Sequence, residues 1–142
     1  MRLACTAFLL AVPACAKACA SEPAPPSFRR DVVPALLKGC ASANGCHGDK
    51  PTHSVYLDLR APAAYSQLVG VEAEARSGAV RVKPGDPAAS FLLDKLRGSL
   101  LPREGKRMPI DPDTGVPLEP SPMATDFDDV LTRWIAAGAP NN

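Results

Sequence analysis

Residues 40–48 constrain the fold of this chain more than any other stretch, because they gather three reactive side chains in one short segment. They read Cys-Ala-Ser-Ala-Asn-Gly-Cys-His-Gly, so that Cys46 is followed directly by His47. Gly45 and Gly48 permit a tight backbone around the pair. Gly39 ends an apolar repeat just before Cys40, which predicts that the segment leaves the C-terminal end of a helix. The fold must therefore present two thiols and an imidazole close together.

The pattern of two thiols and an adjacent imidazole is the one that attaches haem covalently. Each thiol adds across a haem vinyl group to give a thioether, and the histidine reaches the iron. Five residues separate Cys40 from Cys46, whereas the usual motif has two. A few extra flexible residues cost only about 1 kcal/mol of loop closure. We therefore expect Cys40 and Cys46 as thioether anchors and His47 as an iron ligand, the alternative being that Cys46 forms the only thioether.

Composition sets the size and the partners of the protein. A chain of 142 residues with 46% hydrophobic residues allows one domain with a modest core. The formal net charge is +1 and no basic run is present, which argues against a nucleic-acid partner. Sixteen prolines and only 5% aromatic residues predict short helices joined by irregular loops. Some other material, such as a haem, would then help to fill the centre.

The N-terminal residues 1–20 have the pattern of an export signal. A charge at Arg2 precedes an apolar run over residues 3–13, and small residues follow up to Ala20. The apolar run is too short to span a membrane as a helix. We therefore expect an exported protein, located in the periplasm.

A lipid anchor is the alternative to a free N-terminus. Cleavage before Cys15 or Cys19 would leave a cysteine that can be lipidated, and the protein would then be held in the cell envelope. This anchor would be the protein's only contact with a membrane. Residues 21–27 read as a Pro-rich linker, and residues 28–142 as the folded domain.

Apolar spacing predicts four helices in the domain. Residues 28–39 carry apolar side chains at helical spacing, including Leu36 and Leu37, with Asp31 as the cap and Pro34 in the first turn. A second helix is expected at residues 61–69, starting at Pro62, and a third at residues 86–98, with Asp86 as the N-cap. The fourth is expected at residues 125–138, capped by Thr125. Its apolar face consists of Phe127, Val130, Leu131, Trp134 and Ile135.

The segments between these helices are expected to be irregular. Residues 53–60 alternate in hydropathy and read as a short strand or the edge of a loop, and residues 70–83 show no period. Residues 99–124 form a long Pro-rich stretch, and a loop of that length in a small domain is often functional. It contains two sulfur ligand candidates, Met108 and Met123.

Taken in order, these features resemble a known family. A helix running into the Cys-His site, a Pro-Gly-Asp-Pro helix start, Arg-Met-Pro and a closing Arg-Trp-Ile-Ala-Ala-Gly-Ala helix occur in this sequence. The same order is found in small secreted bacterial cytochrome c-like domains, including the planctomycete-type group. The likeness covers residues 28–139.

The resemblance implies an all-α, class I cytochrome c-like fold, in which the first and last helices cross beside one covalent haem c. It implies that Cys40 and Cys46 anchor the haem, that His47 is the proximal ligand and that Met108 is the distal ligand. The function it implies is one-electron transfer between redox partner proteins. Met123 and His53 remain alternative distal ligands.

Two other classes of function use the same residues. Cys40, Cys46, His47 and His53 have the ligand types of a small zinc-binding domain. A disulfide between Cys40 and Cys46 would instead fit a structural or interaction lipoprotein without a cofactor. An enzyme is not expected, because the sequence shows no Ser and His pairing for a triad, no paired carboxylates and no phosphate-binding glycine loop.

Overall fold

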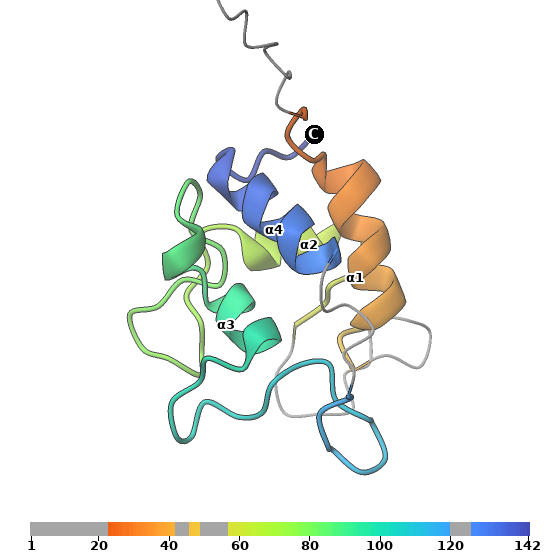
Figure 1. Cartoon of the computed structure of the whole chain (residues 1–142), viewed down its shortest axis with the longest axis vertical. Coiled ribbons are helices and arrows are strands. Elements are labelled where there is room, and N and C mark those ends of the chain that lie inside the picture. The colour runs from red at the N-terminus through yellow and green to blue at the C-terminus, as the bar shows by residue number, and fades with distance from the viewer. Residues whose placement is uncertain (1–22, 42–45, 49–56, 120–125) are drawn as a thin grey trace, which may run out of the picture.

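Helices dominate the computed structural model, which describes residues 23–41, 46–48, 57–119 and 126–142 (Figure 1). Helix accounts for 38% of the described residues and extended pairing for 7%, the latter as isolated bridges. The expected helical character of the domain is seen in this part of the chain. The elements in chain order are the π-helical turn η1 (Phe28–Val32), α1 (Val33–Gly39), α2 (Ala63–Leu68), the 3-10 turn η2 (Pro87–Ala89), α3 (Phe91–Arg97) and α4 (Asp126–Ala136).

The first helix is capped by Ser27 rather than by Asp31. Ser27 has the extended backbone that an N-cap requires, and its Oγ accepts a hydrogen bond from the Arg30 amide at 3.3 Å. Asp31 lies one turn inside the helix, where its Oδ2 accepts from the Ser27 amide at 2.7 Å. Both side chains therefore satisfy amides of the first turn, and the expectation that Asp31 caps the helix was wrong about the capping position.

The wide turn η1 accommodates a proline within the helix. The Val33 amide donates to the Phe28 carbonyl, five residues back along the chain. Pro34 has no amide hydrogen, and in a regular helix its ring would collide with the carbonyl of Arg30. A π-type turn moves that carbonyl outward, so the chain passes directly from η1 into α1.

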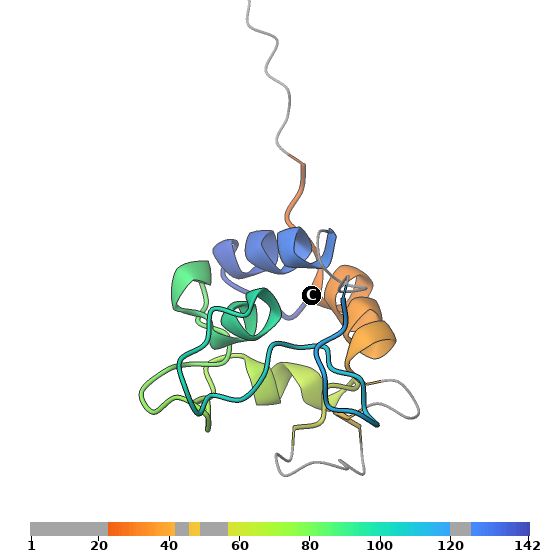
Figure 2. The same ribbon diagram turned by 60° about the horizontal axis from the view of Figure 1, so that its bottom comes forward.

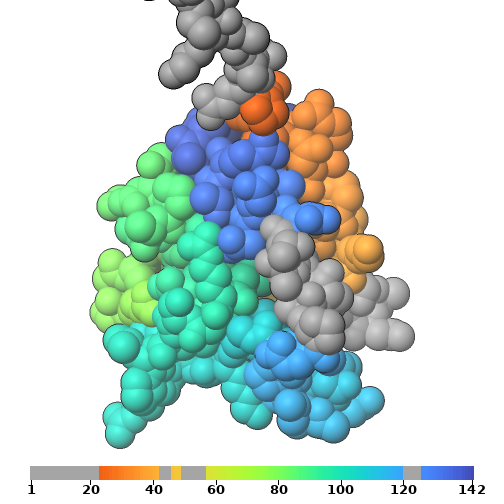
Figure 3. Space-filling model, in the orientation of Figure 1, coloured from red at the N-terminus to blue at the C-terminus, as the bar shows by residue number. Residues whose placement is uncertain are grey.

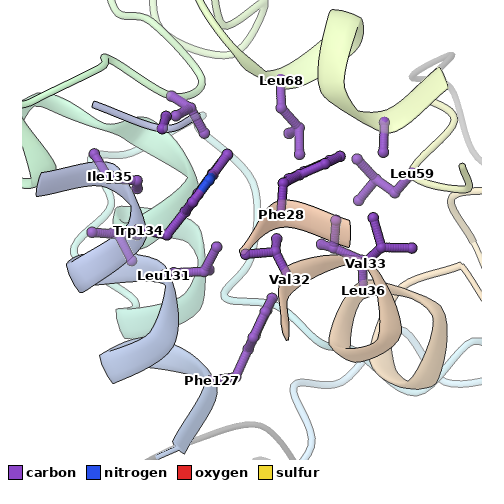
Figure 4. Packing of buried hydrophobic residues seen from close by; sticks show 14 of the residues in the cluster. Phe28, Val32, Val33, Leu36, Leu59, Leu68, Phe127, Leu131, Trp134 and Ile135 are labelled. Atoms are coloured by element: carbon purple, nitrogen blue, oxygen red, sulfur yellow. The ribbon is translucent and has the colours of Figure 1, made fainter. Parts of the chain in front are cut away.

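Phe28 and Trp134 lie together in the middle of the core (Figure 4), and Tyr65 packs against them. Phe28 stacks on Trp134 with ring centroids 5.3 Å apart and meets the edge of Tyr65 at 5.1 Å. The polar atoms of the other two rings are satisfied by the chain after α4: Trp134 Nε1 donates to the Pro140 carbonyl and the Tyr65 hydroxyl to that of Ala139. The position predicted for Trp134 in the core is confirmed, since its side chain is fully buried.

The closing helix α4 packs its predicted apolar face inward, beside η1 and α1 and against α3 (Figures 1 and 2). On its outer side, Arg97 of α3 donates to the Asp128 carboxylate at 2.8 and 2.9 Å and to Thr132 Oγ1 at 2.9 Å. The first and last helices therefore lie side by side. The buried residues of α4 are Phe127, Leu131, Trp134 and Ile135, with Val130 partly buried against them.

The single helix expected for residues 86–98 is interrupted at Ser90. Asp86 caps the start as predicted, accepting from the Ala89 amide at 3.1 Å, but only the 3-10 turn η2 follows. Ser90 then adopts an extended backbone and forms a bridge with Val80. Its buried hydroxyl donates to the Asp86 carbonyl and accepts from the Lys83 amide. These polar contacts compensate for the break, and α3 begins only at residue 91.

Helix α2 matches its prediction closely, and residues 70–83 contain isolated bridges rather than a regular element. Leu68 and Ala64 are buried as expected. Leu37 differs from its prediction, because its side chain is 38% exposed, whereas Leu36 of α1 and Val32 of η1 are buried.

The two ends of the described domain meet. The Asn142 carbonyl accepts from Ser27 Oγ at 2.8 Å and from the Arg29 amide at 2.9 Å, while Asn142 Oδ1 accepts from the Phe28 amide. Pro26 is already buried, so ordered contacts begin two residues before the expected start at residue 28. The expected export signal, with Cys15 and Cys19, lies outside the described residues. Within the described ranges, no helix has both the length and the apolar character needed to cross a bilayer.

Candidate cofactor site

The end of α1 delivers Cys40 to the candidate site. The Cys40 and Ala41 amides both donate to the Leu36 carbonyl, at 2.8 and 3.0 Å, which closes the last turn of the helix. Cys40 itself is the C-cap, with a non-helical backbone. Its side chain packs against the core, while Ala41 is buried. The first thiol is therefore fixed by a helix end, as the sequence predicted.

The chain returns to this helix end at His47. The His47 amide donates to the Cys40 carbonyl at 3.1 Å, and the His47 carbonyl accepts from the Leu59 amide at 2.9 Å. Leu59 is buried in the core. Residues 46–48 are thus held between the end of α1 and the segment that leads into α2.

The two thiols share one environment. Burial, and to a smaller extent the Cys46 thiol, raise the pKa of the Cys40 thiol to about 12. Both residues are present as thiols, and Cys46 is half-buried. The arrangement keeps Cys40 protonated at neutral pH, because ionising a thiol away from water is costly.

The imidazole of His47 is directed toward the protein. The side chain is half-buried, and its Nδ1 has essentially no contact with solvent. His47 follows Cys46 directly, and its backbone is bonded to that of Cys40. His53, the other histidine of the chain, lies outside the described residues.

Met108 is carried by the Met108 loop, residues 98–119, which follows α3 and lies at the bottom of the molecule in Figures 1 and 3. Residues 109–118 of this loop form a hairpin with a bridge between Ile110 and Pro117. The Met108 amide donates to the Lys95 carbonyl at 2.8 Å, and the Leu118 amide donates to the Pro109 carbonyl at 3.0 Å. Met108 is half-buried. The stretch expected to be irregular folds back on itself, and the hydrogen bond of the Met108 backbone ties it to α3.

Of the residues predicted for the site, Cys40, Cys46 and His47 are brought together. Met108 is fixed to a different element, and Met123 lies outside the described residues. Within those residues, no group of three or more His, Cys, Asp or Glu side chains is arranged to hold a metal ion. The proposed four-residue zinc set includes His53, so the described residues do not contain all of it.

Sequence reasoning missed a partly buried ion-pair cluster beside the Met108 loop, formed by Arg76, Asp94 and Glu104. Arg76 donates to both oxygens of Glu104, at 2.6 and 2.7 Å, and to Asp94 Oδ2 at 2.5 Å. Its guanidinium also lies over the Phe91 ring, 4.7 Å from the centroid. The Arg76 hydrogen bonds lower the pKa of Glu104 to about 2.

One signal in the sequence pointed to this cluster. Glu104 is the single acidic residue between Asp94 and Asp111, in a stretch with several Lys and Arg residues. The sequence did not indicate that Arg76 is its partner, because the two residues are 28 positions apart.

Comparisons of this chain with protein-family models, with curated proteins and with solved structures found no match. The residues themselves are the basis for a functional interpretation. Two thiols and an imidazole on one turn form the set of groups that covalent haem attachment needs, so the chain's own residues fit that cofactor.

Proposed function

We propose that this protein is an exported mono-haem c-type cytochrome domain that transfers single electrons between redox partner proteins. The observation that carries the proposal is the hydrogen bond from the His47 amide to the Cys40 carbonyl. It holds the Cys46-His47 pair at the end of α1, where Cys40 also lies. Export is supported by the signal pattern of residues 1–20, and Cys15 or Cys19 would supply a lipid anchor.

The residues of the turn would bind the cofactor covalently. Each thiol, at Cys40 and Cys46, would add its S–H across one vinyl double bond: sulfur would bond to one vinyl carbon and the hydrogen would pass to the other. The addition is redox-neutral and needs no oxidant. His47 would provide an imidazole nitrogen to the iron, and Met108 a thioether sulfur.

The haem supplies, when bound, an iron that cycles between the ferric and ferrous states. The chain tunes that couple through its ligands: a thioether is a soft ligand that favours ferrous iron, so a His and Met pair raises the potential relative to two imidazoles. The helices support this role by burying the Phe28, Trp134 and Leu36 side chains and excluding water from the interior. The side-by-side first and last helices agree with a class I cytochrome c-like architecture.

The test is a visible spectrum of the mature protein, produced in a host that matures c-type cytochromes. Free haem is removed by acid extraction, and the reduced pyridine adduct of the remaining protein is recorded. A retained band is expected, and its position reports whether one or two thioethers have formed. Colourless protein from a host that matures a control cytochrome would overturn the proposal. Metal analysis and a thiol count would then distinguish a zinc protein from a disulfide protein.

Replacing His47 tests the proximal ligand directly. The variant His47→Ala should lose the low-spin spectrum, because no imidazole follows Cys46. An unchanged low-spin spectrum would show that another residue binds the iron on that side.

A further inference from the structure

Lys95 contacts the Met108 loop at more than one point. This residue lies in α3, and its carbonyl accepts from the Met108 amide at 2.8 Å. Its ammonium reaches the same loop from the other end of the side chain, donating to the Glu104 carbonyl at 3.0 Å and to the Lys106 carbonyl at 2.9 Å. One residue thus fixes the backbone at positions 104, 106 and 108.

Gly105 makes the approach of the ammonium possible. It lies between the two acceptor carbonyls with φ +83°, and a Cβ there would be 3.2 Å from Lys95 Nζ. The left-handed backbone turns the carbonyls on either side of it toward the same ammonium. Hydrogen bonds from a charged donor are stronger than neutral ones, so this contact restrains the loop more than a hydroxyl or amide would.

The ion-pair cluster anchors the start of the same loop. The Glu104 carboxylate is held by Arg76, and its Oε2 also accepts from the Leu101 amide at 2.8 Å. Glu104 is only 5% exposed. The Glu104 carbonyl is therefore a fixed acceptor for Lys95.

The far side of the loop is held separately. Arg107 Nη2 donates to the Leu118 carbonyl at 2.7 Å, and Lys106 Nζ donates to the Gly115 carbonyl at 2.7 Å. These contacts close the hairpin onto itself without contacting α3. Among the described residues, two side chains connect the loop to α3: Lys95 contacts the loop backbone directly, and Arg76 bridges the Glu104 carboxylate to Asp94 of α3.

We propose that Lys95 is a positioning residue for Met108, which acts by holding the methionine-bearing loop against α3 so that the sulfur stays available to the iron. The inference rests on the proposed function and names a residue outside the site described above. Lys95 holds the loop through its backbone carbonyl and through its side-chain ammonium. Any substitution keeps the carbonyl, whereas a substitution by an apolar residue removes the ammonium. Loss of the ammonium should loosen the loop and favour replacement of the Met108 sulfur by an added ligand.

The experiment uses the haem-loaded full chain with Lys95→Met, which keeps an unbranched stem and removes the donors. Lys83→Met is the matched control, because the Lys83 ammonium contacts only the Asp86 carboxylate in the described structure, at 2.9 Å, and its side chain is 52% exposed. Imidazole is titrated into each ferric protein, and the reduction potential is measured. Lys95→Met should bind imidazole at least tenfold more tightly than wild type and have a lower potential, while Lys83→Met should match wild type.

The variant Met108→Ala shows whether Lys95 acts through the methionine. The reduction potential of Met108→Ala should be lower than that of wild type. An unchanged potential would show that Met108 is not an iron ligand, and the inference about Lys95 would then fail as well. In that background, Lys95→Met should add no further gain in imidazole affinity. An equal gain with and without Met108 would overturn the inference, as would wild-type imidazole binding by Lys95→Met.

Two further readouts separate folding and attachment from positioning. If Lys95→Met does not fold, Gly105→Ala is used instead, because the added methyl group would crowd the Lys95 ammonium. Gly105→Ala should also bind imidazole more tightly than wild type. Unchanged imidazole binding by this variant would overturn the inference. The pyridine adduct is recorded for every variant. Absence of covalent haem in the wild type as well would refute the proposed function itself, whereas normal haem with unchanged imidazole affinity refutes only the role of Lys95.

Discussion

The His47 amide donates a hydrogen bond to the Cys40 carbonyl at 3.1 Å, so the contact that joins the two residues is made by the backbone. The side chain of Cys40 has no part in it. This hydrogen bond therefore does not require a thiol at residue 40. This separates haem attachment from iron ligation, although both use the same turn.

The single cysteine variants should therefore keep the iron ligation of the wild type. We expect Cys40→Ser to retain covalent haem through Cys46 and to keep the low-spin spectrum, because the carbonyl at position 40 is unchanged. Cys46→Ser should retain one thioether through Cys40. The double variant should lose all haem in acid extraction, and this makes it the control for both.

The pyridine adduct of each reduced protein provides the measurement. A wild-type band identical to that of Cys40→Ser would mean that Cys46 forms the only thioether in the native protein. Loss of the low-spin spectrum in Cys40→Ser would contradict the separation of attachment from ligation.

Trp134 should be among the most costly residues to truncate. Its side chain is fully buried, stacks on Phe28 and donates to the Pro140 carbonyl. Trp134→Ala should lower the free energy of unfolding by about 3–5 kcal/mol, the range for large aromatic side chains removed from a core. Leu101→Ala is the control, because Leu101 is 65% exposed and should cost less than about 0.5 kcal/mol. Urea unfolding monitored by far-UV circular dichroism measures both, and a loss below about 1 kcal/mol for Trp134→Ala would contradict this packing.

Gly98 and Gly85 form a matched pair for testing the end of α3. Both have a left-handed backbone, with φ +79° and +78°, so alanine at either position should cost about 1–2 kcal/mol. The surroundings differ: a Cβ at Gly98 would lie 3.1 Å from Arg107 Cδ, whereas nothing lies within 4 Å at Gly85. Gly98→Ala should therefore be the more destabilising of the two in urea unfolding. Equal losses would show that Arg107 moves aside without cost.

Local patterns were sufficient to predict most of the helices and the closeness of Cys40 and His47 at the end of the first helix. The apolar face of α4 follows from its spacing, and the proximity of Cys40, Cys46 and His47 follows from a short chain segment after a helix end. The break at Ser90 could not be predicted, because it depends on a bridge to Val80 that pairs distant segments.

Contacts across the chain account for most of what the sequence did not predict. Arg76 contacts Glu104 only because the segment after α2 packs against α3. The two residues are 28 positions apart in the sequence, and no pattern of helix or strand spacing relates them. Lys95 likewise looks like an ordinary helix lysine in the sequence, and its contact with the Met108 loop depends on the left-handed turn at Gly105. The sequence could therefore nominate Met108 as a ligand but not the residues that hold it.

Glu104 should contribute to acid stability over a defined pH range. Hydrogen bonds from Arg76 and from the Leu101 amide lower its pKa in the folded protein from 4.5 to about 2. The unfolded chain therefore binds the proton first as the pH falls, and unfolding becomes progressively more favourable. The contribution of Glu104 is fully present above about pH 4.5 and is lost as the pH approaches about 2.

The variant Glu104→Gln should be less stable than wild type at neutral pH and should lose less stability between pH 4.5 and pH 2. Urea unfolding at a series of pH values gives both curves, and the effects of all other groups, which the two proteins share, cancel in their difference. Glu74→Gln removes a charge from a side chain that is 63% exposed and pairs with Arg81 only at 3.4 Å, so it should stay close to wild type at neutral pH. Parallel curves for Glu104→Gln and wild type across this range would show that the Arg76 pair does not stabilise the folded protein.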